Sequence, residues 1–168
     1  MAENTTRPPP APTAASGQTM PTPAIEAHVL KVWDRIRARS AIYRILLSDA
    51  TLVSASHGRV AFRLELQPVH LNSSSTLHGS VSATVVDWAG GLAIASTGLE
   101  RTGVSTDIHV SYVSAARAGD VVEIEAWVSR VGRNMAYTQV EIRKAVVGED
   151  GAKGAVVCTG SHTKFLHV

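Results

Sequence analysis

The stretch STLHGSVSATVVDWAGG, residues 75–91, decides how this chain folds, because it reads as a buried helix that contains one carboxylate. Small and apolar residues flank Asp87 on both sides and continue to about residue 97. Glycine in a helix interior costs about 1 kcal/mol relative to alanine, and this stretch holds two in succession, Gly90 and Gly91. We therefore predict a central helix over residues 78–97 that other backbone approaches closely.

Strands are predicted before and after this helix by the alternation of apolar and polar residues. Two strands, ATLVSAS and RVAFRLELQ, precede it and are separated by a His-Gly turn. Four strands follow it, at about residues 103–113, 121–131, 135–147 and 153–165. Only one connection between strands is long enough for a parallel crossover, so the sheet must be mainly antiparallel. With an amphipathic helix over residues 25–47, broken near Ser40, the fold class is α+β.

Length and composition indicate one globular domain of 168 residues. A net charge of +2, spread along the chain, does not favour a nucleic-acid partner. No run of eighteen apolar residues is present, so no membrane span is expected. The single cysteine cannot form an intramolecular disulfide, and no Cys/His cluster has zinc-like spacing, so no metal is expected.

The first 24 residues differ from the rest, since they hold six of the seven prolines. This composition is typical of a disordered tail, which leaves residues 25–168 as the folded domain. The tail has no apolar core of a secretory signal and makes a poor mitochondrial presequence. We therefore expect a cytoplasmic protein, with the mitochondrion as the alternative.

The carboxylate of Asp87 needs an explanation, because charged residues are rarely buried without a partner. It could simply be an exposed or partnered carboxylate on the outer edge of the helix. Two neighbouring features indicate chemistry instead. The helix begins at LHG, where free N–H groups favour an oxyanion, and Asn72 supplies a side-chain donor upstream. Together these groups could hydrolyse an acyl compound, by stabilising its oxyanion and activating water.

Three segments, NSSSTLHGSVSATVVD, GVSTDIHVSYVSAARAGD and GSHTKFL, resemble the hotdog-fold acyl-CoA thioesterases of the phenylacetyl-CoA thioesterase-like (PaaI-type) group. The resemblance covers about residues 25–168. It implies a hotdog fold, in which an antiparallel sheet wraps around the central helix, here with an extra N-terminal helix. It also implies hydrolysis of acyl-CoA to free acid and coenzyme A without a metal or organic cofactor, coenzyme A being part of the substrate.

The resemblance assigns a role to each matching residue. Asp87 would be the base that activates water, while the Gly79 N–H and the Asn72 amide would bind the thioester carbonyl. His78 would position that loop, and Ser105 would assist near the water. The family commonly has a second glycine after His-Gly, where this chain has Ser80, which leaves the acyl preference open.

Spacing along the helix then predicts a site shared between two subunits. Eight residues separate Gly79 from Asp87, about 12 Å along a continuous helix. An attacking water must lie about 3 Å from the carbonyl carbon, so one helix cannot easily present both groups to one thioester. If both act, Asp87 comes from a partner whose helix lies antiparallel, in a homodimer or a dimer of dimers.

The phosphates of coenzyme A would need cations and donors at strand ends. The candidates are Tyr112, Arg117, Arg130, Arg133, Asn134 and Lys164. Each could equally be a solvated strand-end residue. Cys158 is expected to be a buried strand residue rather than a nucleophile.

Two other functions stay open. The chain could be a non-catalytic acyl-CoA binding or sensing module, with the proline-rich tail as its tether. It could also be a hotdog enoyl hydratase or dehydratase, although the His and acid patterns of those enzymes do not appear after Asp87.

Overall fold

A computed structural model describes residues 22–146 and 153–167 of the chain. Residues 1–21 of the predicted tail and the predicted turn at residues 148–151 lie outside them. Two helices come first, α1 (Thr22–Arg39) and α2 (Ala41–Leu47), separated at Ser40 as predicted. Ser40 caps α2 by accepting a hydrogen bond from the Tyr43 N–H. Helix α1 starts three residues before the predicted position. Its first turn includes Pro23, and proline is tolerated there.

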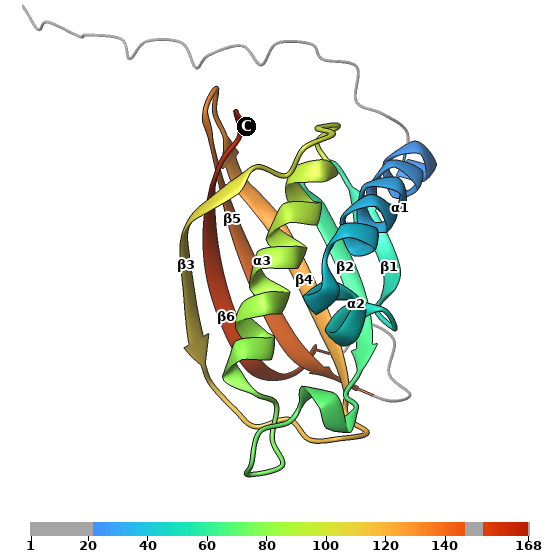
Figure 1. Ribbon diagram of the computed structural model, residues 1–168, viewed down its shortest axis with the longest axis vertical. Helices are drawn as coiled ribbons and strands as arrows, with labels where there is room; N and C mark the ends of the chain where they lie inside the picture. The colour runs from blue at the N-terminus through green and yellow to red at the C-terminus, as the bar shows by residue number, and fades with distance from the viewer. Residues whose placement is uncertain (1–21, 147–152, 168) are drawn as a thin grey trace, which may run out of the picture.

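Six antiparallel strands form one sheet in the order β1-β2-β4-β5-β6-β3. The strands are β1 (Thr51–Ser56), β2 (Arg59–Glu65), β3 (Val104–Tyr112), β4 (Val121–Val131), β5 (Met135–Ala145) and β6 (Lys153–Phe165). A short 3-10 turn, η1 (Pro68–His70), precedes the long helix α3 (Gly79–Ala95). The sheet curves around α3, which lies along its concave face (Figure 1). The predicted α+β hotdog architecture is therefore confirmed.

Close contact between α3 and the sheet depends on glycines on both sides. A Cβ at Gly160 of β6 would lie 2.6 Å from Val86 Cγ2. A Cβ at Gly90 would lie 2.6 Å from the Thr138 hydroxyl oxygen, and one at Gly91 would lie 3.3 Å from Thr102 Cβ. The close approach to the helix glycines therefore comes from side chains and not from backbone, which corrects our expectation. At Gly160 the backbone of β6 comes close to the Val86 side chain of α3.

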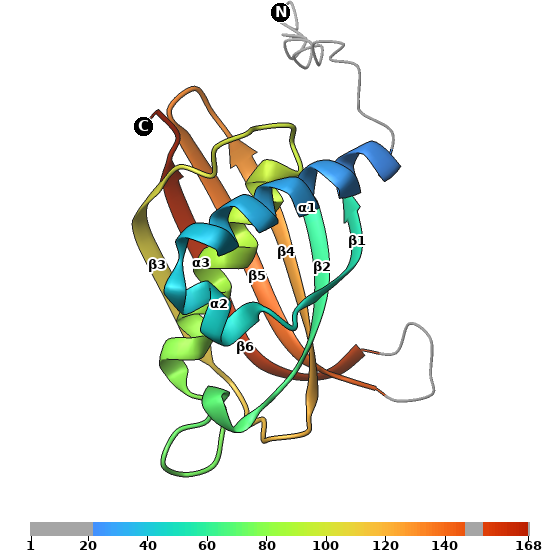
Figure 2. The ribbon, with the colours of Figure 1, turned by 45° about the vertical axis from the view of Figure 1, so that its right-hand side comes forward.

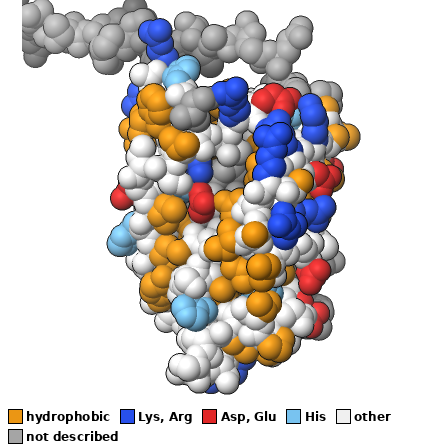
Figure 3. Space-filling model, viewed as in Figure 1, with side chains coloured by type: hydrophobic (Ala, Val, Ile, Leu, Met, Phe, Trp, Pro, Cys, Tyr) orange, Lys and Arg blue, Asp and Glu red, His pale blue; other side chains and the backbone are white. Residues whose placement is uncertain are grey.

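Helix α1 packs across α3 and against β1 (Figure 2). Trp33 of α1 meets Trp88 of α3 edge-on, with ring centroids 5.2 Å apart. At the surface, Glu100 pairs with Lys31 and Arg35 of α1 at 3.2 and 2.9 Å. Figure 3 shows a band of Lys and Arg side chains on the side of α1, and apolar side chains gathered lower on the same face. None of the helices within the described ranges has the length and apolar character needed to cross a bilayer.

Candidate active site

Asp87 lies in the third turn of α3 with three hydrogen-bond donors around its carboxylate. Lys164 Nζ of β6 donates to Oδ1 at 2.9 Å, and Ser105 Oγ of β3 donates to the same oxygen at 3.3 Å. The Tyr43 hydroxyl of α2 donates to Oδ2 at 2.8 Å. The side chain of Asp87 keeps 29% of its surface exposed, so solvent can still reach it. The carboxylate is thus partnered by three elements of the fold and open on one side.

The surroundings of Asp87 hold it in the ionised form. Burial by itself would raise the pKa of the carboxyl, but the ammonium of Lys164 and the hydrogen bonds from Lys164 and Tyr43 outweigh it. The net result is a pKa below the usual value for aspartate. The Lys164 side chain is only 6% exposed, so its charge depends on Asp87 for compensation.

His162 of β6 completes the group. It is fully buried, with Nε2 2.9 Å from Ser105 Oγ and 3.6 Å from Asp87 Oδ1. Burial, with a smaller contribution from Lys164, lowers the pKa of His162 to about 4, so the ring is neutral at pH 7. With Ser105 donating to Asp87, Nε2–H of His162 donates to Ser105. Histidine, serine and carboxylate therefore form one chain of hydrogen bonds.

A second group of polar atoms lies at the start of α3. His78 caps the helix, because its Nδ1 accepts a hydrogen bond from the Ser80 N–H at 3.1 Å. The Gly79 N–H has no acceptor among the described residues. Tyr112 covers this turn, with its ring 3.2 Å from the position a Cβ of Gly79 would take and its hydroxyl donating to the Gly79 carbonyl. Glycine leaves room for that ring and a free N–H beside it.

Asn72 lies next to this helix start. Its Oδ1 accepts hydrogen bonds from the N–H groups of Ser74 and Thr76, and its Nδ2 donates to Thr76 Oγ1 at 3.0 Å. A side-chain amide has two N–H donors, so one remains for a ligand. Asn72 and Gly79 line the same cavity, of about 260 Å³. The two predicted carbonyl-binding donors are therefore brought together.

Asp87 and Ser105 do not line that cavity. The polar groups of one chain thus form two half-sites. The donor half-site consists of Asn72, Gly79 and Tyr112, and the acid half-site consists of Asp87, Ser105, Tyr43, His162 and Lys164. Ser105 lies near the beginning of β3 and Tyr112 at its end, so the two half-sites sit at opposite ends of this strand. A β-bulge between Ser105 and Asp107 shifts the register and puts Ser105 on the same face as Tyr112.

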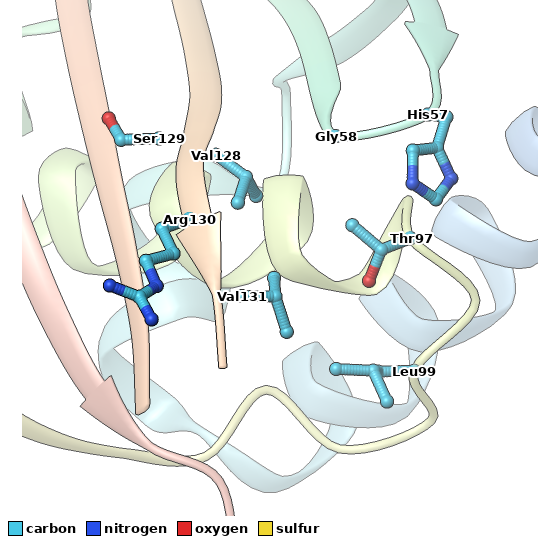
Figure 4. Close-up of a pocket in the computed structure, with 8 residues that line it drawn as sticks. All are labelled: His57, Gly58, Thr97, Leu99, Val128, Ser129, Arg130 and Val131. Atoms are coloured by element: carbon cyan, nitrogen blue, oxygen red, sulfur yellow. The ribbon is translucent and has the colours of Figure 1, made fainter. Parts of the chain in front are cut away.

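The candidates for coenzyme A are also divided. Arg117 is exposed between β3 and β4, close to the donor half-site, where the Ala116 carbonyl accepts from the Leu77 N–H. Arg130 is at the far end of β4, beside a cavity of about 560 Å³ (Figure 4). Arg133 and Asn134 follow it in the turn between β4 and β5. In the part of the chain that the structure describes, Arg117 thus lies at the opposite end of β4 from Arg130, Arg133 and Asn134.

Two of the candidates make close contacts within the chain. Lys164 is buried and paired with Asp87, because the alternation along β6 turns its side chain toward α3, so it is not an open strand-end cation. Tyr112 belongs to the donor half-site, through its hydrogen bond to Gly79. Conversely, sequence reasoning missed Tyr43 and His162 as members of the acid half-site.

Cys158 is buried on β6, as predicted, and burial raises the pKa of its thiol to about 11. The described part of the chain contains no group of three or more His, Cys, Asp or Glu arranged to hold a metal ion.

Comparison with known proteins places this architecture in a family. Residues 74–149 match the Thioesterase superfamily. Human acyl-coenzyme A thioesterase 13 is 35% identical over 121 residues, which cover 72% of this chain and 82% of the human protein.

Solved structures of similar fold include members of the same family. Zebrafish thioesterase superfamily member 2 has a TM-score of 0.71 at 31% identity, covering 82% of this chain and 96% of that one. The Escherichia coli PaaI protein (TM-score 0.70, 17% identity, 86% and 96% coverage) shows the fold alone. So does a Streptococcus pneumoniae hypothetical thioesterase solved with coenzyme A (TM-score 0.66, 23% identity, 79% and 95% coverage). The identity and coverage of the human relative, on a shared fold, show that this chain belongs to the hotdog thioesterase superfamily.

Proposed function

We propose that this protein hydrolyses acyl-CoA thioesters to a free acid and coenzyme A. The observation that carries the proposal is an ionised, partly open carboxylate, Asp87, in a fold that also holds two unused donors at Asn72 and Gly79. The similarity to the human acyl-coenzyme A thioesterase 13 supports this substrate class.

The chemistry needs only these groups and water. The Gly79 N–H and the Asn72 amide donate to the thioester carbonyl oxygen and stabilise the oxyanion that forms when water attacks the carbonyl carbon. Asp87 takes a proton from that water. Collapse of the tetrahedral intermediate breaks the carbon–sulfur bond, and the coenzyme A thiolate leaves and takes up the proton.

We further propose that two chains share each site, with β3 as the contact. β3 is an edge strand with exposed apolar side chains, among them Val104, Ile108 and Tyr112, and such an edge can pair with another copy. If two β3 strands pair antiparallel about a point between Ile108 and His109, midway between Ser105 and Tyr112, Ser105 of one lies opposite Tyr112 of the other. The acid half-site of one chain then lies beside the donor half-site of its partner. Within a single chain these two half-sites are separated along α3.

The same arrangement would gather the separated coenzyme A candidates. Antiparallel pairing puts the end of one chain that carries Arg117 near the end of its partner that carries Arg130, Arg133 and Asn134. We propose these four residues as phosphate and adenosine contacts, with the cations drawn from both chains.

The test is thiol release from a panel of acyl-CoAs by purified protein. Asp87→Asn should lower kcat by about 10² to 10⁴, the usual contribution of a general base. Tight binding without thiol release would favour a sensing module, and loss of enoyl absorbance with an intact thioester would favour a hydratase.

Shared sites are tested by mixing two inactive variants. Asp87→Asn and Asn72→Ala chains should regain part of the activity when combined, because one site of the heterodimer then has both wild-type halves. Verified heterodimers that stay inactive would refute the shared site and leave the reaction class untouched.

A further inference from the structure

The two oxygens of Asp87 are not equivalent in their hydrogen bonding. Oδ1 accepts from Lys164 Nζ and Ser105 Oγ, whereas Oδ2 accepts only from the Tyr43 hydroxyl among the described residues. A carboxylate oxygen has two lone pairs in its plane, so the donors around Oδ1 use both. Oδ2 keeps one lone pair, and the Asp87 side chain as a whole keeps 29% of its surface exposed to solvent.

Two contacts restrain Tyr43, and through its hydrogen bond Tyr43 restrains the orientation of the Asp87 carboxylate. Its N–H bonds to the Ser40 cap of α2, and its ring packs against Trp33 with centroids 6.1 Å apart. Burial, and then the charge of Asp87, raise the pKa of the phenol well above its usual value, so Tyr43 stays protonated and acts as a donor. A rotation of the carboxylate would break the 2.8 Å bond to Tyr43.

We propose that Oδ2 of Asp87 holds the attacking water and that Tyr43 is the residue that positions it. This rests on the proposed thioester hydrolysis. The water then has one defined place on the Asp87 carboxylate. Tyr43 is a positioning residue, because it acts on the water through Asp87.

Every charged or titratable group that faces Asp87 bears on the pH dependence. Lys164 and His162 face it from β6 and Tyr43 faces it from α2, while Ser105 of β3 adds a neutral donor. Removal of the Tyr43 hydroxyl takes away one donor to the charged form and leaves the other groups in place. The pKa of Asp87 should therefore rise in Tyr43→Phe.

The experiment compares wild type, Tyr43→Phe and Tyr137→Phe. Tyr137 is an exposed tyrosine of β5 outside both half-sites and serves as the matched control. A ¹³C NMR titration of the Asp87 carboxyl, assigned with Asp87→Asn, reads the pKa without any substrate. We expect a higher pKa in Tyr43→Phe, an acid limb of kcat/KM displaced to higher pH, and a kcat about tenfold lower on the plateau with KM little changed.

An unchanged NMR titration, or a loss of kcat without a displaced acid limb, would overturn the proposal. Should Tyr43→Phe not fold, difluorotyrosine at position 43 keeps the ring and hydroxyl while strengthening the donor. The acid limb should then move to lower pH, and no movement would overturn the role of Tyr43. A wild type that hydrolyses no acyl-CoA would overturn the proposed function, and with it the water site, while the NMR titration would still decide whether Tyr43 and Asp87 are coupled.

Discussion

Lys164→Met isolates the charge that compensates Asp87, since methionine keeps most of the side-chain volume. At the 2.9 Å separation of Nζ and Oδ1, two unit charges attract by about 6 kcal/mol at an effective dielectric constant of about 20. The cost of burying the ammonium cancels a large part of this. Breaking a buried pair usually costs about 3–5 kcal/mol, but Asp87 keeps two donors and some solvent access. We therefore expect the free energy of unfolding to fall by about 2 kcal/mol at pH 7.

The pH dependence of this loss identifies its cause. In the wild type the pKa of Asp87 is lowered, so its contribution to stability is present above the unfolded pKa of about 3.9 and is lost as the pH falls through the folded pKa. Lys164→Met removes the two largest causes that lower the pKa of Asp87, so we expect burial to raise that pKa above the unfolded value. The variant therefore gains stability relative to the wild type as the pH falls from 7, and its deficit shrinks.

Urea unfolding at one protomer concentration, at pH 7 and pH 4.5, measures both effects. Lys144→Met is the matched control, because Lys144 lies 2.8 Å from Asp120 in a pair of which about a third of each side chain is exposed. Such surface pairs contribute about 0–1 kcal/mol. A deficit for Lys164→Met that equals the control, or one that does not change with pH, would contradict a stabilising role for the Lys164–Asp87 pair.

Two further outcomes are expected. Gly160→Ala should destabilise the protein by about 1–3 kcal/mol in urea unfolding, because its Cβ would lie 2.6 Å from Val86 Cγ2, and adding Val86→Ala should recover part of that loss. Strict additivity of the two substitutions would contradict this close contact. Cys158, buried and with its pKa raised to about 11, should resist a thiol reagent at pH 8 in the native state and react in denaturant. Fast native labelling would show that β6 opens at this point.

Much of the fold follows from periodicity alone. The alternation in β4 and β6 predicts strands at residues 121–131 and 153–165, and the structure has both with these bounds. Chain order and short connections then require antiparallel pairing. The order of the strands in the sheet could not be predicted in this way. β3 lies beside β6, and the paired residues are far apart in sequence, so no local pattern indicates that they pair.

The acid half-site shows where local reasoning ends. His162 and Lys164 could have been found, since a strand alternates its faces and both share the phase of buried Cys158. Two polar residues on an inward face indicate a buried polar site. Tyr43 gives no such signal, because it reaches Asp87 only through the packing of α2 on α3, 44 residues away in sequence.

The lowered pKa of Asp87 limits what the carboxylate can contribute as a base. Proton transfer is most efficient when the pKa of the base lies near the working pH, and Lys164 and Tyr43 move Asp87 away from neutrality. The site therefore holds Asp87 as an oriented anion that is ionised at neutral pH, at the expense of its strength as a base. His162, neutral with a pKa of about 4, supplies a hydrogen bond through Ser105 without competing for the proton. Hydrolysis should consequently persist well below pH 6.5, the ordinary pKa of histidine, and an acid limb near that value would mean that a histidine, and not Asp87, accepts the proton from water.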